Sequence, residues 1–461
     1  MSVVLVIPDH IADQLQTAAG HPLETAGVLL VSVVETADDS LRLLAREIHW
    51  VEDSAYLKRE YSSLSIASHG YVRALGRAEK LGATAIWFHT HPGVDSKPTP
   101  SEHDDVVDDQ IADLFRLRSG SSYYGALIMA PRSDGFSFTG HLDSDDGQII
   151  PIDRLFIVGD RLRLVRSFNL EIAGLSPAFD RNVRAFGAAV QQTLADLRIA
   201  VVGCGGTGSV IAEQLARLGV RKLMLIDPDE LSSSNVTRVY GSTPDDVGKP
   251  KVQILGDHLQ RIAPDASIDR VRGMITVKPI AKLLSACDVV FGCTDDNAGR
   301  LVLSRLATYL LIPVIDSGVL LTSGDTGLLE GIDGRVTVLV PGQACLICRD
   351  RIDLARASAE LLTPEERIRR ADEGYAPALG RAEPAVVTFT TAVGAIAVSE
   401  LLERLIGYGV DPRPSEILLR CHDREISTNI ARPRERHYCH PSSGKIGMGI
   451  TEPYLEQTWP T

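Results

Sequence analysis

Gly203-Cys204-Gly205-Gly206-Thr207-Gly208 follows the apolar run at 199–202 and leads into residues 209–218, whose apolar spacing is helical. A second apolar run follows at 223–226. Strand, glycine-rich turn, helix and strand in this order predict a βαβ unit within a parallel sheet covered by helices on both faces. Further strands are expected at 289–292 and 314–316.

The glycine-rich turn also predicts a nucleotide site. Glycines there let backbone amides at the helix N-terminus, from Gly203, Gly205, Gly206 and Gly208, approach a phosphate closely. Asp227 follows Gly208 by nineteen residues, at the end of the next strand, where a carboxylate can accept hydrogen bonds from ribose hydroxyls. These two features fit NAD and ATP equally well.

The segments that follow favour ATP. Asn235-Val236-Thr237-Arg238 and Gly248-Lys249-Pro250-Lys251 supply more positive charge than a pyrophosphate on glycine amides needs, whereas a triphosphate needs it. Asp295, in Cys293-Thr294-Asp295-Asp296-Asn297, ends a later strand, where a magnesium ion could bridge carboxylate and phosphate oxygens. The alternative is an aspartate that only caps the next helix.

These residues, in this order and spacing, resemble the E1-like adenylyltransferases, which include ubiquitin-activating enzymes and the ThiF/MoeB-like activators of sulfur-carrier proteins. The resemblance covers roughly residues 175 to 425, and Phe179-Asp180-Arg181-Asn182 resembles the family's entry helix, with Asn where Gln is usual. It implies a Rossmann-like domain with a mainly parallel sheet that adenylates a protein C-terminal carboxylate using ATP and magnesium. By resemblance, Asp227 holds the ribose, Asp295 binds magnesium, and the residues that contact phosphates are Asn235, Arg238, Lys251 and, from the neighbouring protomer of a homodimer, Arg181.

Two departures from that family concern cysteine. Cys345-Leu346-Ile347-Cys348 matches the first Cys-x-x-Cys pair of the family's structural zinc site, but His437-Tyr438-Cys439-His440 stands where the second pair is expected. A Cys3His site with Cys439 and either His437 or His440 is one prediction, and loss of the metal is the alternative. The stretch 353–391 contains no cysteine for a thioester, so the chain stops at the adenylate, passes it to a partner such as an E2-like protein, or uses a hydroxyl such as Thr363 or Ser358.

A second constellation lies near the N-terminus. In Trp87-Phe88-His89-Thr90-His91-Pro92 the two histidines are spaced i and i+2 at a strand end, so both imidazoles point to one face. Ser101-Glu102-His103-Asp104 reads by itself as a helix N-cap. Together, His89, His91 and Asp104 supply three zinc ligands and leave the fourth position open, as catalysis requires.

This pattern, with Glu24 upstream, resembles the JAMM (JAB/MPN) metalloproteases over roughly residues 1 to 150. The resemblance implies an α/β metalloprotease domain in which His89, His91 and Asp104 bind zinc, Glu24 is the general acid/base, and Ser101 steadies the tetrahedral intermediate. The nine residues between His91 and Ser101 make the spacing longer than the family's commonest form. The implied reaction is hydrolysis of a peptide or isopeptide bond after the C-terminus of a ubiquitin-like protein.

Length and composition set the wider limits. At 461 residues the chain should hold two to four domains, and 47 basic against 60 acidic residues leave no basic excess for general nucleic-acid binding. No apolar run is long enough to span a membrane and the N-terminus resembles no export signal, so a cytoplasmic protein with reduced cysteines is expected. The predicted division is a JAMM domain at 1–155, a linker at 156–174, an E1-like domain at 175–432 and a tail at 433–461.

One half therefore activates a C-terminal carboxylate and the other hydrolyses an amide at such a carboxylate. The simplest shared substrate is a ubiquitin-like protein that is processed or deconjugated by one half and adenylated by the other, and this resembles bacterial gene fusions that join the two families in ubiquitin-like pathways. A second hypothesis is activation of a sulfur carrier in a biosynthetic pathway, with the protease maturing the carrier. A third, of another class, is a non-catalytic assembly scaffold.

Overall fold

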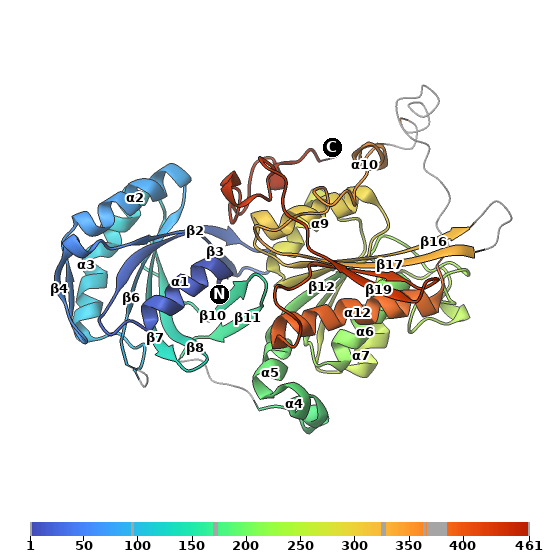
Figure 1. Cartoon of the computed structure of the whole chain (residues 1–461), viewed down its shortest axis with the longest axis horizontal. Helices are drawn as coiled ribbons and strands as arrows, with labels where there is room; N and C mark the ends of the chain where they lie inside the picture. The colour runs from blue at the N-terminus through green and yellow to red at the C-terminus, as the bar shows by residue number, and fades with distance from the viewer. Residues whose placement is uncertain are drawn as a thin grey trace. The chain divides into compact units, whose positions relative to one another are not determined.

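The computed structural model describes residues 2–93, 96–168, 174–323, 329–362, 366 and 385–459. It divides into two compact units (Figure 1). Unit 1 comprises Met1–Ala173 with Ile446–Ile450, and unit 2 comprises Gly174–Lys445 with Thr451–Thr461. Within the described residues, no helix combines the length and apolar character that crossing a membrane requires.

Unit 1 is built on a nine-stranded mixed sheet in the order β11-β10-β1-β3-β2-β6-β7-β8-β9. Its strands are β1 (Val3–Pro8), β2 (Ala26–Glu35), β3 (Leu41–Trp50), β6 (Thr84–Thr90), β7 (Tyr123–Arg132), β8 (Gly135–Ser144), β9 (Ile149–Pro151), β10 (Arg154–Val158) and β11 (Arg163–Arg166). A separate hairpin consists of β4 (Tyr56–Arg59) and β5 (Leu64–Ile66). Its helices are α1 (Asp9–Ala19), α2 (His69–Leu81) and α3 (Glu102–Ser119).

Alternation along the strands gives the sheet of unit 1 two apolar faces. Ile86 and Phe88 of β6 belong to one core with Ile11 and Leu15 of α1. Trp87, on the opposite face of the same strand, belongs to the other core. That second core is covered by α2 and α3 through Ala74, Leu75, Ala78, Ala112 and Phe115. The histidines of β6 extend the Trp87 face, so they lie on the side of the sheet that α3 covers.

The expected linker at 156–174 needs a correction. Most of β10 and all of β11 fall within it, and both strands belong to the sheet of unit 1. β10 pairs in parallel with β1 and antiparallel with β11. Leu155, Phe156, Ile157 and Val158 are all buried, so this stretch is core rather than linker. The expected tail at 433–461 is divided between the two units, because residues 446–450 group with unit 1.

Unit 2 contains an eight-stranded sheet in the order β14-β13-β12-β15-β16-β17-β18-β19. The strands are β12 (Arg198–Val202), β13 (Lys222–Ile226), β14 (Ser267–Val271), β15 (Val289–Gly292), β16 (Val314–Ser323), β17 (Leu329–Leu339), β18 (Glu416–Arg420) and β19 (Glu425–Asn429). Pairing is parallel from β14 to β16 and antiparallel from β16 to β19, so the sheet is mixed and its parallel half is the Rossmann-like part.

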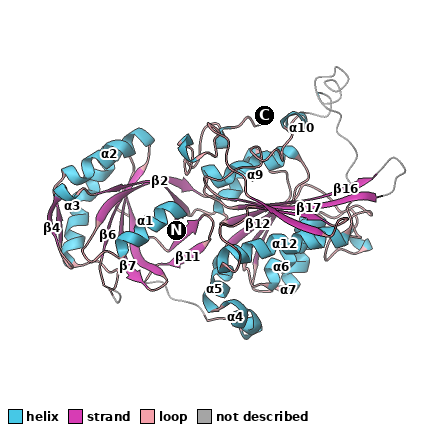
Figure 2. Cartoon of the chain, viewed as in Figure 1, coloured by secondary structure: helices cyan, strands magenta, loops and turns pink. Residues whose placement is uncertain are grey.

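Helices cover both faces of this sheet (Figure 2). The helices described in unit 2 are α4 (Asp180–Phe186), α5 (Ala188–Asp196), α6 (Gly206–Arg217), α7 (Lys251–Ile262), α8 (Lys278–Leu283), α9 (Asn297–Tyr309), α10 (Leu354–Glu360) and α12 (Val387–Ile406). In Figure 1, α6, α7 and α12 lie on one side of the sheet and α9 on the other. The predicted order of strand, glycine turn, helix and strand is present as β12, α6 and β13.

Candidate active sites

The three predicted metal ligands of unit 1 converge. His89 Nε2 lies 3.3 Å from Asp104 Oδ1, and His91 Nε2 lies 3.7 Å from Asp104 Oδ2. The two imidazole Nε2 atoms are 3.2 Å apart. One ligand atom from each residue lies within 4.8 Å of the others, which fits three donors around a single ion. Two imidazoles and a carboxylate are ligands that zinc accepts, so the residues present fit the metal that the sequence predicts.

Local structure explains this convergence. The two histidines leave the end of β6, and the His91 ring is fixed at Nδ1 by the carbonyl of Lys97 at 3.2 Å. Asp104 is the third residue of α3, where it forms a capping box with Ser101. The Ser101 hydroxyl donates to Asp104 Oδ2 at 2.8 Å, and the Asp104 amide donates to Ser101 Oγ at 3.3 Å. The N-cap interpretation and the ligand interpretation of Ser101 and Asp104 are therefore compatible.

The carboxyl groups of this site have opposite pKa shifts. Burial would raise the pKa of Asp104, but hydrogen bonds with His89 and His91 hold it far below its ordinary value. Burial raises the pKa of Glu24, and the nearby His89 and His91 partly offset that rise. Glu24 is only 7% exposed. The pairing of Ala26 with His89 brings Glu24, two residues earlier, to the level of His91.

The backbone around Glu24 is held by the β4–β5 hairpin. The backbone amide of Glu24 donates to the Glu60 carbonyl at 3.0 Å, and Arg59 Nε donates to the Glu24 carbonyl at 2.9 Å. Glu24 is thus an acid fixed beside the two histidines, not a solvated carboxylate at the rim. A buried acid near these metal-type ligands could exchange a proton with a water molecule bound there.

Unit 2 contains a cavity of about 500 Å³ at the carboxyl ends of its parallel strands. Gly203, Gly205, Gly206 and Thr207 line it from the turn between β12 and α6. Gly203 has a φ of +93°, and a Cβ at Gly208 would lie 1.8 Å from the Gly203 carbonyl oxygen, so both positions require glycine. The backbone amides at the N-terminus of α6 are therefore not screened by side chains at these glycines, so a phosphate in the cavity could approach them closely.

Charged side chains of both signs line the same cavity. The predicted residues among them are Asp227, Arg238, Lys251 and Asp295. Four charged residues that the sequence analysis did not single out also line it: Asp229, Asp296, Arg300 and Arg356. The Asp227-Pro228-Asp229 spacing was the available signal for Asp229, whereas Arg300 and Arg356 had none because only the fold brings α9 and α10 to the cavity.

The two aspartates after β15 have different roles. Asp296 is the N-cap of α9, where its Oδ2 accepts the Gly299 amide at 2.5 Å. Asp295 is exposed at the cavity and does not cap the helix. The helix-cap alternative therefore applies to Asp296 and not to Asp295.

Two predicted phosphate contacts lie elsewhere among the described residues. Asn235 does not line the cavity. It lies in a turn in which its backbone N–H donates to the Ser232 carbonyl at 2.9 Å. Arg181 is exposed on α4 and does not line the cavity of its own chain. Ser358 is exposed on α10 and donates to the Leu354 carbonyl at 2.8 Å, whereas Thr363 lies outside the described residues.

A second metal-type cluster joins Cys345, Cys348, His437 and Cys439. His437 Nδ1 lies 3.6, 3.4 and 3.2 Å from the sulfurs of Cys345, Cys348 and Cys439 respectively. A hydrogen bond with Cys439 lowers the pKa of the Cys345 thiol below its ordinary value, which favours the thiolate form that binds metals. His440 is not in the cluster, because its Nδ1 accepts the Ser442 amide at 3.2 Å as the N-cap of a short helix. Three sulfurs and one imidazole fit a closed, tetrahedral zinc site.

Comparison with known proteins agrees with a βαβ nucleotide fold in unit 2. The sequence model of the ThiF family matches residues 179–440. The chain is 28% identical over 251 residues to a molybdopterin-synthase adenylyltransferase of Escherichia coli (strain K12), covering 53% of this chain and 88% of that protein. It is 31% identical over 160 residues to the sulfur carrier protein ThiS adenylyltransferase of the same strain, covering 34% of this chain and 60% of that protein. It is 28% identical over 158 residues to the SAMP-activating enzyme E1 of Haloferax volcanii, covering 34% of this chain and 55% of that protein.

The fold and the cavity define a Rossmann-like α/β nucleotide-binding protein. The matched stretch spans more than half of the sequence, and the chain belongs to the ThiF family. The match begins at residue 179, so the His89, His91 and Asp104 site lies outside it.

Proposed function

We propose that unit 2 adenylates the C-terminal carboxylate of a ubiquitin-like or sulfur-carrier protein. The observation that carries this proposal is the cavity in which glycine-turn amides, Arg238, Lys251 and the carboxylate of Asp295 meet at the strand ends. One of the relatives named above is by its name an adenylyltransferase of a sulfur carrier protein, another is an adenylyltransferase of molybdopterin synthase, and the third is an activating enzyme E1. ATP fits this cavity because the site combines backbone donors, cations and a cation-binding acid.

In the proposed reaction, a carboxylate oxygen attacks the α-phosphorus of ATP. A new bond forms between that oxygen and the phosphorus, the bond to the bridging oxygen of the β-phosphate breaks, and pyrophosphate leaves with the electron pair. The protein forms no bond in this step, so its residues act by position and charge. Lys251 and Arg238 neutralise charge on the phosphates, and Asp295 would hold a magnesium ion, which would supply further positive charge there when bound.

The test is exchange of radiolabelled pyrophosphate into ATP by the full-length chain, with and without a candidate carrier protein. Carrier-dependent exchange that is lost in Lys251→Ala and Asp295→Ala supports adenylation. Lys249→Ala is the matched control, because the exposed Lys249 pairs with Asp246 at 2.8 Å and does not line the cavity. No exchange with any ubiquitin-like carrier would favour the scaffold hypothesis.

For unit 1 we propose a JAMM-type zinc peptidase that cleaves after the C-terminus of the same kind of carrier. The support is the convergence of His89, His91 and Asp104 beside the buried Glu24. His89, His91 and Asp104 would hold the metal, which when bound supplies a Lewis acid for the scissile carbonyl. Glu24 moves the proton of the attacking water to the leaving amine, and Ser101 donates a hydrogen bond to the developing oxyanion.

Maturation of a carrier precursor and removal of finished conjugates both fit this pairing of activities. Two substrates distinguish these activities. Cleavage of a carrier with a short C-terminal extension reports maturation, and cleavage of a carrier linked to a lysine side chain reports removal of conjugates. Cleavage is followed by mass spectrometry with and without a chelator. A homodimer through unit 2 belongs to the same proposal, because Arg181 would reach the phosphates of a neighbouring protomer. Transfer of the adenylate to an E2-like partner also belongs to it, because no thioester cysteine lies in 353–391.

A further inference from the structure

A second carboxylate of α3 lies one helical turn beyond the metal-ligand candidate Asp104. Asp108 follows it by four residues, so both side chains leave the same side of the helix. Both are partly buried, whereas the neighbouring Asp105 and Asp109 are exposed. α3 therefore turns two carboxylates toward the sheet and leaves the others in solvent.

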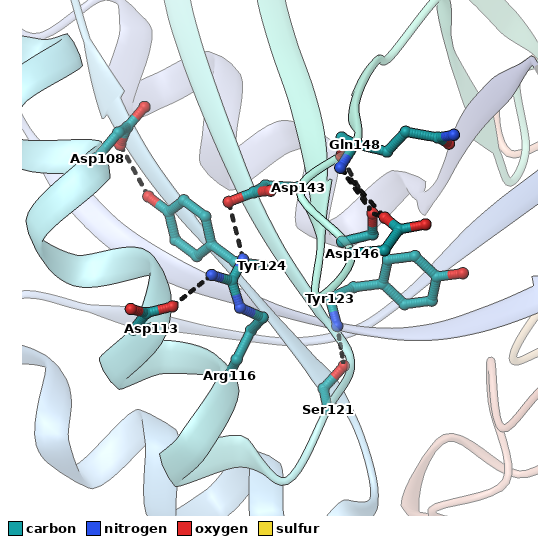
Figure 3. Close-up of polar contacts among 10 residues, drawn as sticks. Asp108, Asp113, Arg116, Ser121, Tyr123, Tyr124, Asp143, Asp146 and Gln148 are labelled. Carbon is teal, nitrogen blue, oxygen red and sulfur yellow. Dashed lines mark hydrogen bonds and ion pairs between the residues drawn. The ribbon is translucent and has the colours of Figure 1, made fainter.

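Tyr124 of β7 fixes Asp108 in place (Figure 3). The Tyr124 hydroxyl donates to Asp108 Oδ1 at 2.8 Å. Tyr124 is 1% exposed, and its ring packs edge-on against Phe115 with the ring centroids 5.4 Å apart. A buried, well-packed phenol has little freedom to move, so Asp108 is held at one position.

Strand register relates Tyr124 to the predicted metal site. His89 pairs with Ile128 of β7, and Tyr124 lies four residues before Ile128, so His89 and Tyr124 share one face of the sheet. Burial raises the pKa of Asp108, whereas the Tyr124 hydrogen bond and the nearby charges of His141 and His89 lower it. Asp108 therefore lies one helical turn beyond Asp104, and its Tyr124 partner shares the face of the sheet that carries His89.

Anchoring α3 does not by itself require this carboxylate. Arg116, farther along the helix, donates to Asp143 of β8 at 2.8 Å and to Asp113 at 2.6 Å (Figure 3). Phe115 also packs the helix onto the sheet core. Partly burying a carboxylate costs solvation free energy, and a bound cation next to it would recover part of that cost.

We propose that Asp108, held by Tyr124, is a positioning residue of the His89, His91 and Asp104 site that strengthens cation binding from behind the ligands. This inference rests on the metal-site assignment in the proposed function. Outer carboxylates of this kind orient ligands and add negative charge that a divalent cation favours, and losing one typically costs 10- to 100-fold in metal affinity.

The test is titration of the full-length metal-depleted protein with Co²⁺ in competition with a chromophoric chelator. Both metal sites give visible d–d bands, whereas near-ultraviolet thiolate charge-transfer bands arise only from the cysteine cluster. The first site is therefore read as the d–d absorbance that is gained without a matching gain in charge-transfer absorbance. Asp108→Asn should raise the Co²⁺ Kd of the first site by about 10-fold. Asp108→Glu, which keeps the charge, should recover most of the affinity. Asp113→Asn, on the same helix with a 92% exposed side chain, is the matched control and should leave the Kd unchanged.

An unchanged Kd in folded Asp108→Asn would overturn the inference while leaving the metal site intact, and so would a failure of Asp108→Glu to recover affinity. If Asp108→Asn does not fold, Tyr124→Phe decides, because it removes one hydroxyl and keeps the ring; an unchanged Kd there overturns the inference. If the double variant His89→Ala, His91→Ala keeps the full d–d signal of the wild-type protein, the metal-site assignment itself is overturned.

Discussion

Lys251 Nζ lies 2.7 Å from Asp229 Oδ2 and 3.9 Å from Asp227 Oδ1, so its closer ion pair is with the second aspartate of Asp227-Pro228-Asp229. Asp227 is buried, and its oxygens accept the amides of Cys204 at 2.6 Å and Asp229 at 2.8 Å. Its carboxylate therefore braces the glycine turn. The Asp229 side chain is 61% exposed at the cavity, so we expect Asp229 rather than Asp227 to accept hydrogen bonds from ribose hydroxyls.

We predict that Asp229→Asn raises the Kd for ATP and changes the melting temperature little. A hydrogen bond to a charged group contributes about 1.5 to 3 kcal/mol, so the ATP Kd should rise about 10-fold or more. Isothermal titration with ATP measures the Kd, and thermal melting measures stability. Asp246→Asn, outside the cavity, is the control. An unaltered ATP Kd would return the ribose contact to Asp227.

Asp227→Asn should instead lower stability. Replacing the carboxylate weakens two bonds to buried backbone amides and leaves an amide donor facing the turn, with an expected cost of about 1 to 3 kcal/mol. Urea unfolding at constant pH measures this cost. A stable Asp227→Asn variant with weakened ATP binding would show that Asp227 contacts the nucleotide directly.

Metal content tests the two ligand clusters independently. The protein should carry about one zinc per chain at His89, His91 and Asp104 and one at the cysteine cluster. His89→Ala, His91→Ala should lose one equivalent by mass spectrometry of metals and keep the other. Unchanged zinc content would contradict the assignment of the first site.

The cysteine cluster offers a matched pair of histidines. His437→Ala removes a ligand candidate, whereas His440→Ala removes only the cap of a short helix. The first substitution should release one zinc and lower the melting temperature, because structural zinc binding contributes to folding free energy. The second should keep the zinc. Equal zinc content in the two variants would count against a Cys3His site.

Glu24→Gln should abolish cleavage of a carrier fusion while zinc stays bound, because the base is not a ligand. Loss of a general base typically slows a reaction by about 10²- to 10⁴-fold. Glu47→Gln is the control, since Glu47 binds Arg77 at 2.5 Å on another part of the sheet. Cleavage at the wild-type rate in Glu24→Gln would mean that a different acid is the base.

Short-range sequence pattern predicted the local geometry where a single backbone element sets it. The i and i+2 histidines share a face because side chains along a strand alternate with a period of two. The conformation of the glycine turn is set locally, because the positions of Gly203 and Gly208 leave no room for a side chain. Pattern failed where tertiary packing decides. The choice of His437 over His440, the placement of Arg300 at the cavity and the incorporation of β10 and β11 into the first sheet depend on segments far apart in the sequence.

The last prediction concerns Arg181, which is exposed on α4 and absent from the described lining of its own chain's cavity. If it serves the phosphates of a neighbouring protomer, Arg181→Ala should be folded and inactive. Mixing it with Asp295→Ala, also inactive alone, should restore activity, because a mixed dimer has one site with both residues intact. With random exchange about half of the dimers are mixed and each has one good site of two, so pyrophosphate exchange should recover to about a quarter of wild type. Subunit exchange is verified with differently tagged chains. Failure to recover after verified exchange would mean that Arg181 acts within its own chain or only supports the fold.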